Sequence, residues 1–529
     1  MTYLAVPISA GDITAAGAQI ESARAAGAEI IELRTDYLNE LNADLVKSLL
    51  EHAKPTKLPI IVTCRDKTQG GAGDWPLELR TEVLSAAVRA GADFIDCEYD
   101  TFLKGDTQAK LTGTIAENKK TRLILSAHNF AGPFDDLGAL YEDIKISCPE
   151  AIPKLVYTAR HINDCFEGFD LLHNAVGEVI VFCMGEAGLI SRILAKKLGG
   201  FVTFACVDNE NATAPGQITA EQMKKLYRWD RVNAETELFG VIGSPVAHSL
   251  SPAIFNACFD ERGVNGLYLP LLVEGEKSEF NEFLENIMAR NRLGFGGFSV
   301  TIPHKAHALD YANAAGEFVE PLAEEIGAVN TLKIGIGPRV SGYNTDYSGA
   351  RDALCAALKI DKHGLHSKTC AVVGAGGAAR AVVAGLTDVG ANVTIYNRTV
   401  AKAQALSEEF KCRYAPLEAL SQMDAQVVIN CTSIGMYPDV DKTPVPVEFL
   451  QSGMTVFDTV YNPAETLLLK QAAKAGAKTI SGVEMFIRQA MAQYKLFIGT
   501  EAGDPPEKTM RKTISRLFLL YKNGVRDGK

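Results

Sequence analysis

The first 228 residues alternate short apolar runs with longer helix-like stretches. The runs are rich in Val and Ile and mostly apolar throughout, which is typical of strands buried on both faces of a parallel sheet. Stretches such as 81–90 and 186–198 are rich in Ala, Leu and Lys and long enough for helices. Eight β-α units in sequence predict a (β/α)8 barrel, with an open doubly wound sheet as the alternative. The eight runs are 4–8, 30–33, 60–63, 94–97, 123–127, 154–157, 179–183 and 202–206.

The polar segment 224–237 breaks this rhythm and predicts a domain boundary. A new strand-like run at 238–242 opens a small α/β unit, and a third unit contains a run at 370–373 before a glycine cluster. Helical patterns close the chain and are expected to pack back on the middle unit. The predicted domains are 1–228, a linker at 229–237, a second unit at 238–345 completed by about 486–529, and a third at 346–485.

The composition and charge of the chain argue against several classes of function. The chain has 529 residues with 53 Lys and Arg against 64 Asp and Glu, a net charge of −11 without a basic block. This balance argues against nucleic-acid or anionic-membrane partners. No stretch approaches the ~18 apolar residues of a spanning helix, and the first 30 residues are unlike a targeting peptide. The eleven cysteines are scattered without a Cys-x-x-Cys pair, so we expect reduced thiols in the cytosol and no metal site.

Polar residues gather at the predicted strand ends of the first unit, where (β/α)8 barrels hold their chemistry. Lys154 has apolar neighbours, and burial lowers the pKa of an amine. A neutral amine attacks a ketone to form an iminium, which acidifies the neighbouring carbon. His128 could remove that proton, and arginines would hold an anionic substrate. The other polar residues near these ends are Glu32, Arg34, Arg65, Arg192, Thr213 and Gln217.

Each of these residues has an ordinary structural explanation when it is taken singly. A lysine at a strand start is more often a solvent-facing terminus than a Schiff base. A single histidine is more often a structural hydrogen-bond partner than a base, and Arg–Glu pairs are common on barrel rims. Their joint placement at predicted strand ends favours a role in chemistry.

These segments resemble type I 3-dehydroquinate dehydratase across nearly all of residues 1–228. The resemblance is carried by Glu-Leu-Arg-Thr-Asp (32–36), Thr-Cys-Arg (63–65), Ser-Ala-His-Asn-Phe (126–130), Pro-Lys-Leu-Val (153–156), Met-Gly-Glu-Ala-Gly-Leu-Ile-Ser-Arg (184–192) and Thr-Ala-Pro-Gly-Gln (213–217). It implies loss of water from 3-dehydroquinate, which gives 3-dehydroshikimate, with Lys154 as the Schiff-base lysine and His128 as the base. The implied substrate contacts are Glu32, Arg34, Arg65, Arg192, Thr213 and Gln217.

The chain departs from that family at Gln69, where a Glu is usual. An amide can hydrogen-bond but cannot tune His128 by charge. Asp66 and Asp74 are the nearby carboxylates that would compensate. The departure bears on the rate of dehydration and not on the type of reaction.

The third unit begins with a glycine-rich turn between a predicted strand and helix, Gly374-Ala-Gly-Gly-Ala-Ala379. This G-x-G-x-x-A pattern lets a backbone approach a pyrophosphate at a helix N-terminus. The run at 393–396 reads as the next strand and is followed by Asn397, Arg398 and Thr399. An arginine and a hydroxyl suit a 2′-phosphate where NAD sites carry an acid, so the pattern favours NADP.

The second unit carries hydroxyls and one lysine that suit a ketone substrate. Ser249 and Ser251 are two residues apart and can grip one carboxylate, although a Ser/Pro turn is the ordinary explanation. Lys305 and Asp346 could relay a proton to a ketone as a hydride arrives. A salt bridge that ties two units together is the alternative for this pair.

Residues 238–529 resemble shikimate dehydrogenase, with further matches in Asn-Cys-Thr-Ser-Ile-Gly-Met (430–436), Val-Tyr-Asn-Pro (460–463) and Gly-Val-Glu-Met-Phe-Ile-Arg-Gln-Ala (482–490). The resemblance implies Lys305 and Asp346 as the catalytic pair. It implies substrate contacts at Ser249, Ser251, Thr301, Asn330, Tyr461 and Gln489. It implies NADP contacts at Gly374, Ala375, Gly376, Gly377, Ala378, Asn397, Arg398 and Thr399.

The two resemblances describe consecutive reactions, and the chain resembles fusions of the two activities known in plants and some microbes. We therefore expect a bifunctional enzyme that makes 3-dehydroshikimate and reduces it with NADPH to shikimate. The alternatives are a quinate dehydrogenase fusion of quinate catabolism and a non-catalytic ligand sensor. Because the chain starts almost at its first predicted strand, we expect a cytoplasmic setting. Oligomeric state is not predicted.

Overall fold

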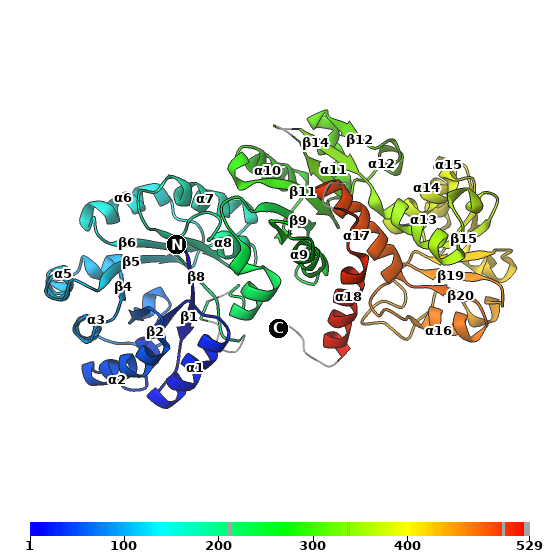
Figure 1. Cartoon of the computed structure of the whole chain (residues 1–529). Helices are drawn as coiled ribbons and strands as arrows, with labels where there is room; N and C mark the ends of the chain where they lie inside the picture. The colour runs from blue at the N-terminus through cyan, green and yellow to red at the C-terminus, as the bar shows by residue number, and fades with distance from the viewer. Residues whose placement is uncertain (209–212, 215, 336, 338, 500–502, 523–529) are drawn as a thin grey trace.

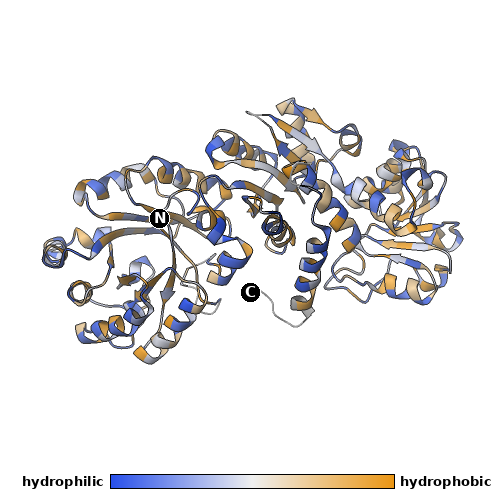
Figure 2. Cartoon of the chain, viewed as in Figure 1, coloured by the Kyte–Doolittle hydropathy of each residue, from blue (hydrophilic) through white to orange (hydrophobic). Residues whose placement is uncertain are grey.

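The computed structural model describes residues 1–208, 213–214, 216–335, 337, 339–499 and 503–522. Three sheets follow one another along the molecule: the barrel strands at one end, a mixed sheet in the middle and a second parallel sheet at the other end (Figure 1). The strands of all three sheets are mostly hydrophobic, whereas the helices carry both hydrophilic and hydrophobic residues (Figure 2). Among the described residues, no helix is both long enough and apolar enough to cross a bilayer.

Eight parallel strands form the first sheet in the order β7-β6-β5-β4-β3-β2-β1-β8. Strands β1 to β7 each lie beside their sequence neighbours and β8 lies beside β1, so the sheet curves round on itself. A doubly wound sheet instead reverses its order at a central strand. The expected barrel is confirmed and the open sheet is excluded. The strands are β1 (Tyr3–Ile8), β2 (Ile30–Arg34), β3 (Ile60–Thr63), β4 (Phe94–Glu98), β5 (Arg122–Asn129), β6 (Ile152–Thr158), β7 (Ile180–Met184) and β8 (Val202–Phe204).

The barrel has a seam between β7 and β8. The described residues of these two strands share no ladder, and one backbone hydrogen bond from Phe201 N to Val179 O (2.8 Å) lies at their start. Strand β8 ends at Phe204 instead of 206, and α8 (Leu189–Leu194) is shorter than the helix expected over 186–198. The other barrel helices are α1 (Ile13–Ala25), α2 (Ala43–Ala53), α3 (Leu77–Ala90), α4 (Tyr99–Phe102), α5 (Thr107–Asn118), α6 (Leu137–Ser147) and α7 (Cys165–Asn174).

The middle unit is a six-stranded mixed sheet in the order β10-β9-β11-β13-β14-β12. Its strands are β9 (Glu237–Gly243), β10 (Gly266–Leu272), β11 (Phe295–Val300), β12 (Phe318–Val319), β13 (Thr331–Ile334) and β14 (Val340–Tyr343). Its helices are α9 (Ser251–Arg262), α10 (Lys277–Met288), α11 (Lys305–Ala315) and α12 (Pro321–Ile326). The C-terminal helices α17 (Gly482–Ile498) and α18 (Glu507–Lys522) return to this unit, where Tyr494, Phe497 and Met510 share a core with Phe239 and Phe255. Residues 523–529, the end of the predicted unit, lie outside the described residues.

The last sheet is wholly parallel, in the order β17-β16-β15-β18-β19-β20. Its order reverses between β15 and β18, and ligands of such sheets bind beyond the carboxyl ends of strands at this switch point. The expected dinucleotide-binding (Rossmann) fold is confirmed. Its strands are β15 (Thr369–Val373), β16 (Asn392–Asn397), β17 (Arg413–Pro416), β18 (Val427–Asn430), β19 (Thr455–Asp458) and β20 (Lys478–Ile480), and its helices are α13 (Thr345–Leu358), α14 (Gly377–Asp388), α15 (Val400–Glu409) and α16 (Leu467–Lys474).

The segment predicted as a linker packs between the barrel and the middle unit. Trp229 is buried, and its Nε1 donates to Glu29 Oε1 of the barrel at 3.0 Å. Lys197 Nζ, just after α8, donates to the Ala234 carbonyl at 2.7 Å. Phe166 of the barrel and Phe283 of the middle unit lie in one hydrophobic cluster. The two units are therefore joined by buried contacts as well as by the chain.

Candidate active sites

The side chains that point into the barrel form two layers, one apolar and one polar. The first inward residues of β2 to β6 belong to one buried hydrophobic cluster: Ile30, Ile61, Phe94, Ile124 and Ile152. Two residues later along each strand the inward side chain is polar, because side chains on one face of a strand recur every second residue. These buried polar residues are Glu32, Thr63, Asp96, Ser126 and Lys154. The barrel interior is therefore polar toward the carboxyl ends of its strands.

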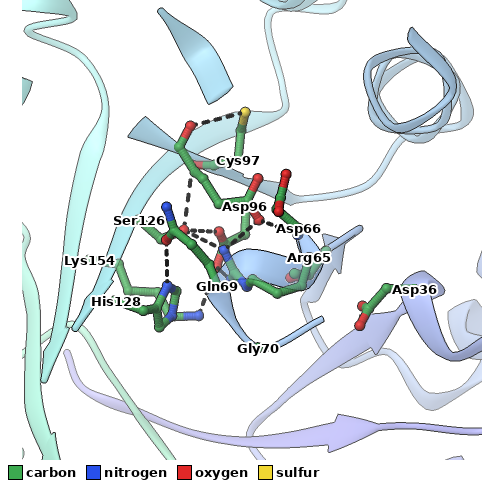
Figure 3. A network of polar contacts seen from close by, with 12 residues as sticks. Asp36, Arg65, Asp66, Gln69, Gly70, Asp96, Cys97, Ser126, His128 and Lys154 are labelled. Carbon is green, nitrogen blue, oxygen red and sulfur yellow. Dashed lines mark hydrogen bonds and ion pairs between the residues drawn. The ribbon is translucent and has the colours of Figure 1, made fainter. Parts of the chain in front are cut away.

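Lys154 lies inside this layer, in the middle of β6 and not at its start. Its Nζ is 2.7 Å from Asp96 Oδ2, 3.6 Å from Glu32 Oε1 and 4.4 Å from the centre of the Phe204 ring. Its neighbours along β6 are apolar, as the sequence shows, but its inward neighbours on β2 and β4 are carboxylates. Figure 3 shows Lys154 close to His128, Ser126 and Asp96.

Asp96 joins Lys154 to a buried network of ion pairs. Arg65 contacts Asp96 at 2.8 Å, Glu98 at 2.9 Å and Ser126 Oγ at 2.6 Å. Burial by itself would raise the pKa of Asp96, but the charges of Arg65 and Lys154 outweigh it and hold that pKa well below its usual range. Arg65, which the sequence assigns to substrate, thus has both terminal nitrogens engaged by protein groups.

His128 lies beside Lys154 and is held by Gln69. The distance from His128 Nδ1 to Gln69 Oε1 is 3.1 Å, and the ring stacks on Phe130 with centroids 6.4 Å apart. Burial, followed by the charges of Arg65 and Lys154, holds the pKa of His128 well below its usual value. Because the amide oxygen accepts from Nδ1–H, the lone pair of the neutral ring lies on Nε2. His128 is therefore equipped to accept a proton at neutral pH.

The suggested compensation by Asp66 or Asp74 is wrong. Asp66 forms an ion pair with Arg80 at 2.5 Å, and Asp74 is exposed beside Lys67. The carboxylate that raises the pKa of His128 is Asp96. It acts across the site while the Gln69 amide orients the ring.

Arg192 differs from Arg34, Arg65 and Arg80 because no carboxylate among the described residues forms an ion pair with it. The side chain is 1% exposed and stacks on Phe182 at 4.4 Å, and Nη1 is 3.4 Å from the Phe204 carbonyl. Among the residues that the structure describes, its buried Nε and Nη2 have no hydrogen-bond partner, and burial lowers its pKa to about 10. A buried charge without a counter-ion is costly, so this cation is suited to an anionic ligand.

The remaining expected barrel contacts are already paired within the protein. Arg34 forms a two-bond ion pair with Asp36 (2.9 and 2.7 Å). Glu32 accepts from Thr63 Oγ1 at 2.8 Å. Beyond β8, Thr213 N donates to Gln217 Oε1 at 2.9 Å.

Sequence reasoning missed Asp96, Glu98 and Ser126. The signal was present in β4, Phe-Ile-Asp-Cys-Glu, where acidic residues occupy alternate positions of an otherwise apolar strand. Acidic side chains at every second position of a strand lie on one face of it. When the strand is buried on both faces, these side chains are inside the protein and need cationic partners. Reading only the strand ends passed over this position.

The glycine-rich turn lies at the switch point of the Rossmann sheet. Gly374 has φ +114°, which L side chains rarely adopt, and a Cβ there would lie 3.1 Å from the Cys431 carbonyl. Nothing lies within 4 Å of a Cβ placed on Gly376 or Gly377, where α14 begins. Between α14 and α15 lies a hollow of about 330 Å³ lined by Ala375, Gly376, Gly377, Arg380, Lys402, Ala405, Leu406 and Glu409.

The residues expected around this turn lie in two groups. Ala378 is exposed in the first turn of α14. Asn397 ends β16, and its Nδ2 donates to the Thr399 carbonyl at 2.9 Å. Arg398 and Thr399 are exposed between β16 and α15, and Lys402 is an additional cation at this edge that the sequence reasoning did not select.

Lys305 and Asp346 meet as the sequence predicted. Lys305 Nζ lies 2.5 Å from Asp346 Oδ2, from the first turns of α11 and α13 respectively. The Lys305 side chain is one-third exposed, so the pair is open to solvent. Asn330 fixes the start of α13, since its Oδ1 accepts from Thr345 N at 2.8 Å and its Nδ2 donates to Thr345 Oγ1 at 3.0 Å.

The other expected contacts of this half come from several elements. Ser249 Oγ accepts from Ser251 N at 3.3 Å at the start of α9. Thr301 directly follows β11, and its methyl group would clash with a Cβ on Gly243. Tyr461 is exposed and stacks on Phe486 with centroids 5.3 Å apart, while Gln489 of α17 packs against Gly349 of α13.

Family profiles match the two halves separately. A profile for type I 3-dehydroquinase matches residues 4–234. A profile for the shikimate dehydrogenase substrate binding domain matches residues 241–332, and one for shikimate / quinate 5-dehydrogenase matches residues 356–437.

Individual relatives cover either the whole chain or its second half. Over 519 residues the chain is 36% identical to the bifunctional 3-dehydroquinate dehydratase/shikimate dehydrogenase, chloroplastic, of Arabidopsis thaliana, which covers 95% of this chain and 83% of that protein. It is 43% identical to the shikimate dehydrogenase (NADP(+)) of Methanosarcina mazei, covering 53% of this chain and 97% of the relative. The solved shikimate 5-dehydrogenase of Thermus thermophilus, in complex with NADP(H) and shikimate, shares 33% identity over 53% of this chain and 99% of its own, with a TM-score of 0.46. The chain belongs to the family of bifunctional 3-dehydroquinate dehydratase/shikimate dehydrogenases.

Proposed function

We propose that the barrel dehydrates 3-dehydroquinate through a Schiff base on Lys154 and that the second half reduces the product, 3-dehydroshikimate, to shikimate with NADPH. The observation that carries the proposal is that each half holds a lysine against a carboxylate within 2.7 Å. In the barrel a neutral imidazole lies beside that lysine. One chain thus holds the groups for two carbonyl reactions in series.

In the barrel, the Lys154 amine attacks the ketone carbon after its ammonium loses a proton, for which the neutral imidazole of His128 is the neighbouring base. Loss of water then gives the iminium. His128 Nε2 removes a proton from the neighbouring carbon and leaves an enamine. The electron pair of the enamine then expels the substrate hydroxyl, which takes the proton from His128 and leaves as water, so that the imidazole is again neutral. Hydrolysis of the iminium frees 3-dehydroshikimate and restores the amine.

Arg192 binds the substrate carboxylate in this proposal. Its Nε and Nη2, which have no partner among the described residues, match the bidentate geometry of a carboxylate. The remaining groups proposed to contact 3-dehydroquinate are Glu32, Arg34, Arg65, Thr213 and Gln217.

In the second half, Lys305 donates a proton to the ketone oxygen while Asp346 holds the ammonium in place. NADPH supplies the hydride when bound. The residues of the glycine turn fit its pyrophosphate, and Arg398, Thr399 and Lys402 suit the 2′-phosphate by charge and hydrogen bonding. The remaining proposed substrate contacts are Ser249, Ser251, Thr301, Asn330, Tyr461 and Gln489.

Steady-state assays with four substrate pairs test the proposal against its alternatives. We expect 3-dehydroshikimate to be reduced with NADPH at least about tenfold more efficiently than with NADH, because the exposed Arg398 favours the phosphate. Shikimate should be oxidised with NADP⁺ in preference to quinate. A preference for quinate would favour the catabolic fusion, and binding of all ligands without turnover would favour a sensor.

Replacing Gln69 by Glu should move the acidic limb of the dehydratase pH profile. A carboxylate beside His128 Nδ1 stabilises the imidazolium, so the pKa of His128 rises, by about one unit or more. Because the base works as neutral imidazole, kcat/KM falls as the pH drops through that pKa. We therefore expect Gln69→Glu to shift the limb to higher pH, measured as kcat/KM for 3-dehydroquinate from acidic to neutral pH.

The matched control for this shift is Gln108→Glu, the same change at an exposed barrel residue whose amide contacts the Ser147 carbonyl. It should leave the limb where it is in the parent. A limb that stays in place in Gln69→Glu would show that the Gln69 contact does not tune His128.

We propose that the partners are these small molecules and not nucleic acid. A cytoplasmic location stays a prediction from the sequence, which fractionation of the native cells tests.

A further inference from the structure

Residues 66–72 form a tight loop between β3 and α3, at the carboxyl end of the barrel strands. The Asp66 carbonyl accepts from Gln69 N and from Gly71 N, both at 2.9 Å. A Cβ on Gly71 would lie 2.2 Å from the carbonyl that precedes the loop, so the chain doubles back closely on itself. Gln69 points from this loop toward His128, whose Nδ1 lies 3.1 Å from the amide oxygen (Figure 3). The position of the loop therefore decides where the amide meets the imidazole.

The Asp66 side chain fixes the start of this loop. Its Oδ1 accepts from Thr68 N at 2.8 Å and from Thr68 Oγ1 at 2.6 Å. Its Oδ2 accepts from Arg80 Nη2 of α3 at 2.5 Å. Its main-chain N donates to Glu98 Oε1 of β4 at 3.0 Å. One carboxylate oxygen thus shapes the turn, and the other ties the turn to the barrel wall.

The groups that anchor Asp66 are themselves held in a buried network. Arg80 Nη1 donates to Glu98 Oε2 at 3.0 Å, and Glu98 Oε1 also accepts from Arg65 Nη1 at 2.9 Å. The Arg80 side chain is 7% exposed and that of Glu98 is 1% exposed. Buried paired charges keep their places, because moving one of them away leaves the other desolvated without a partner. The loop is therefore fastened to a rigid part of the barrel.

The far end of the loop is held by residues at the end of β2. Asp36 Oδ2 accepts from Ala72 N at 3.1 Å. Arg34 Nη2 donates to the Gly70 carbonyl at 3.3 Å. Gln69 lies between these contacts and the anchor at Asp66, so both ends of its turn are tied to neighbouring strands.

We propose that Asp66 is a positioning residue of the dehydratase: it holds the loop so that the Gln69 amide oxygen accepts from His128 Nδ1–H. This inference rests on the proposed function, which assigns His128 as the base. Asp66 touches neither the substrate nor His128, and its charge is paired with Arg80. It acts through the geometry of the turn and not through its charge. When Nδ1–H is held, the neutral ring presents its lone pair at Nε2, whereas an unheld ring also adopts the tautomer whose Nε2 carries the proton and cannot accept one.

Asp66→Asn keeps the shape of the side chain and replaces the oxygen that faces Arg80 by an amide NH2, which only donates. We expect kcat for dehydration of 3-dehydroquinate to fall about fivefold, a ratio that one hydrogen bond supports, with KM within about twofold. The tautomer of the base matters to proton transfer and not to substrate binding, and the parent KM shows that the barrel is folded. Asp66→Ala, which also removes the contacts with Thr68, should lower kcat further. Parent kcat in both variants, or a rise in KM at parent kcat, would overturn the inference.

Asp164→Asn is the matched control. Asp164 lies in the loop after β6 and is partly buried like Asp66. Its Oδ2 accepts from Arg160 N at 2.7 Å and from His161 N at 3.1 Å. The same substitution in this loop should leave kcat and KM at parent values. An equal fall in kcat would show that loosening any loop at this end of the barrel has the effect, and would contradict a specific role of Asp66.

The double variant Asp66→Asn/Gln69→Ala tests whether Asp66 acts through Gln69. If it does, Asp66→Asn should change kcat by less than about twofold in the Gln69→Ala background, since the contact that it supports is already lost. An undiminished fivefold effect in that background would overturn the inference, and so would a Gln69→Ala protein that is as fast as the parent.

His128→Ala distinguishes failure of the inference from failure of the proposed function. Loss of the base should lower kcat by at least about 10²-fold. If His128→Ala is as fast as the parent, the proposed role of His128 fails and the inference fails with it. If His128→Ala is inactive while Asp66→Asn and Asp66→Ala keep the parent kcat, only the inference fails.

Discussion

Lys154→Ala is expected to abolish the dehydratase and to leave the reduction of 3-dehydroshikimate intact. The amine is the only nucleophile in the proposed reaction, so its loss should lower kcat for 3-dehydroquinate by at least about 10⁴-fold. Borohydride added with 3-dehydroquinate should link a ligand adduct to the parent protein and none to the variant. Rates from absorbance of the conjugated product and the intact mass of the treated protein are the two measurements.

A matched variant separates loss of the nucleophile from loss of the side-chain volume. Without Lys154, Asp96 and Glu32 face each other with one positive charge fewer, which destabilises a buried network by a few kcal/mol. Lys154→Met fills more of the space and should be equally inactive. The reductase activity of the same molecules shows whether the chain is folded. A borohydride adduct that persists in Lys154→Ala would exclude this lysine as the Schiff-base residue.

Lys305→Ala is expected to abolish the reduction of 3-dehydroshikimate and to leave the dehydratase intact, the opposite of Lys154→Ala. Removing the proton donor should lower kcat for reduction of 3-dehydroshikimate by about 10²–10⁴-fold, the usual contribution of a general acid. Dehydration of 3-dehydroquinate should stay at the parent rate, because the proposed dehydratase groups all lie in the barrel. Both rates are measured on one preparation, with NADPH absorbance for the reduction.

Lys277→Ala is the control for this loss. Lys277 forms an exposed ion pair with Asp310 at 2.7 Å in the same unit, and its removal should affect neither reaction. If Lys305→Ala reduces as fast as the parent, the Lys305–Asp346 pair is the salt bridge between two units that the sequence also allowed. If both reactions fail in a folded Lys305→Ala protein, the two sites are not independent.

The barrel strands could be predicted closely from the sequence because they are buried on both faces. Continuous apolar runs identify such strands without the need to decide which face is inside. The run at 60–63 matches β3 at both ends, while the last run was set two residues too long. That end lies at the seam, where β1 is the one strand of the described residues that forms a ladder with β8, and the local sequence pattern carries no sign of the seam.

The sequence could not show which charged residues pair with one another and which stay available to a ligand. Arg65 and Arg192 both follow strands and look alike in the sequence. Yet Arg65 is paired with two carboxylates, whereas two nitrogens of Arg192 have no partner in the described part of the chain. The difference arises from β4, whose acidic residues lie beside Arg65 across the sheet. A local motif identifies the residue type. Whether the side chain is already paired within the protein depends on neighbours far along the chain.

Lys305 and Asp346 could be paired in advance because their motifs are dense, but the buried hydrogen bonds inside the middle unit could not be predicted. Tyr268 of β10 donates to Ser299 of β11 at 2.6 Å, and Ser299 donates to Gln493 of α17 at 2.8 Å, so single hydroxyl and amide groups join distant parts of the chain. Such groups are common in any sequence, and only the packing of α17 on the middle unit brings them together.

The most direct test of two sites in series is NADPH consumption after 3-dehydroquinate alone is added to the parent protein, with 3-dehydroshikimate as the parallel substrate. The account predicts consumption with both, after a short lag with 3-dehydroquinate while the intermediate forms. Consumption with 3-dehydroshikimate alone would contradict a working barrel, and consumption with neither would contradict the bifunctional assignment as a whole.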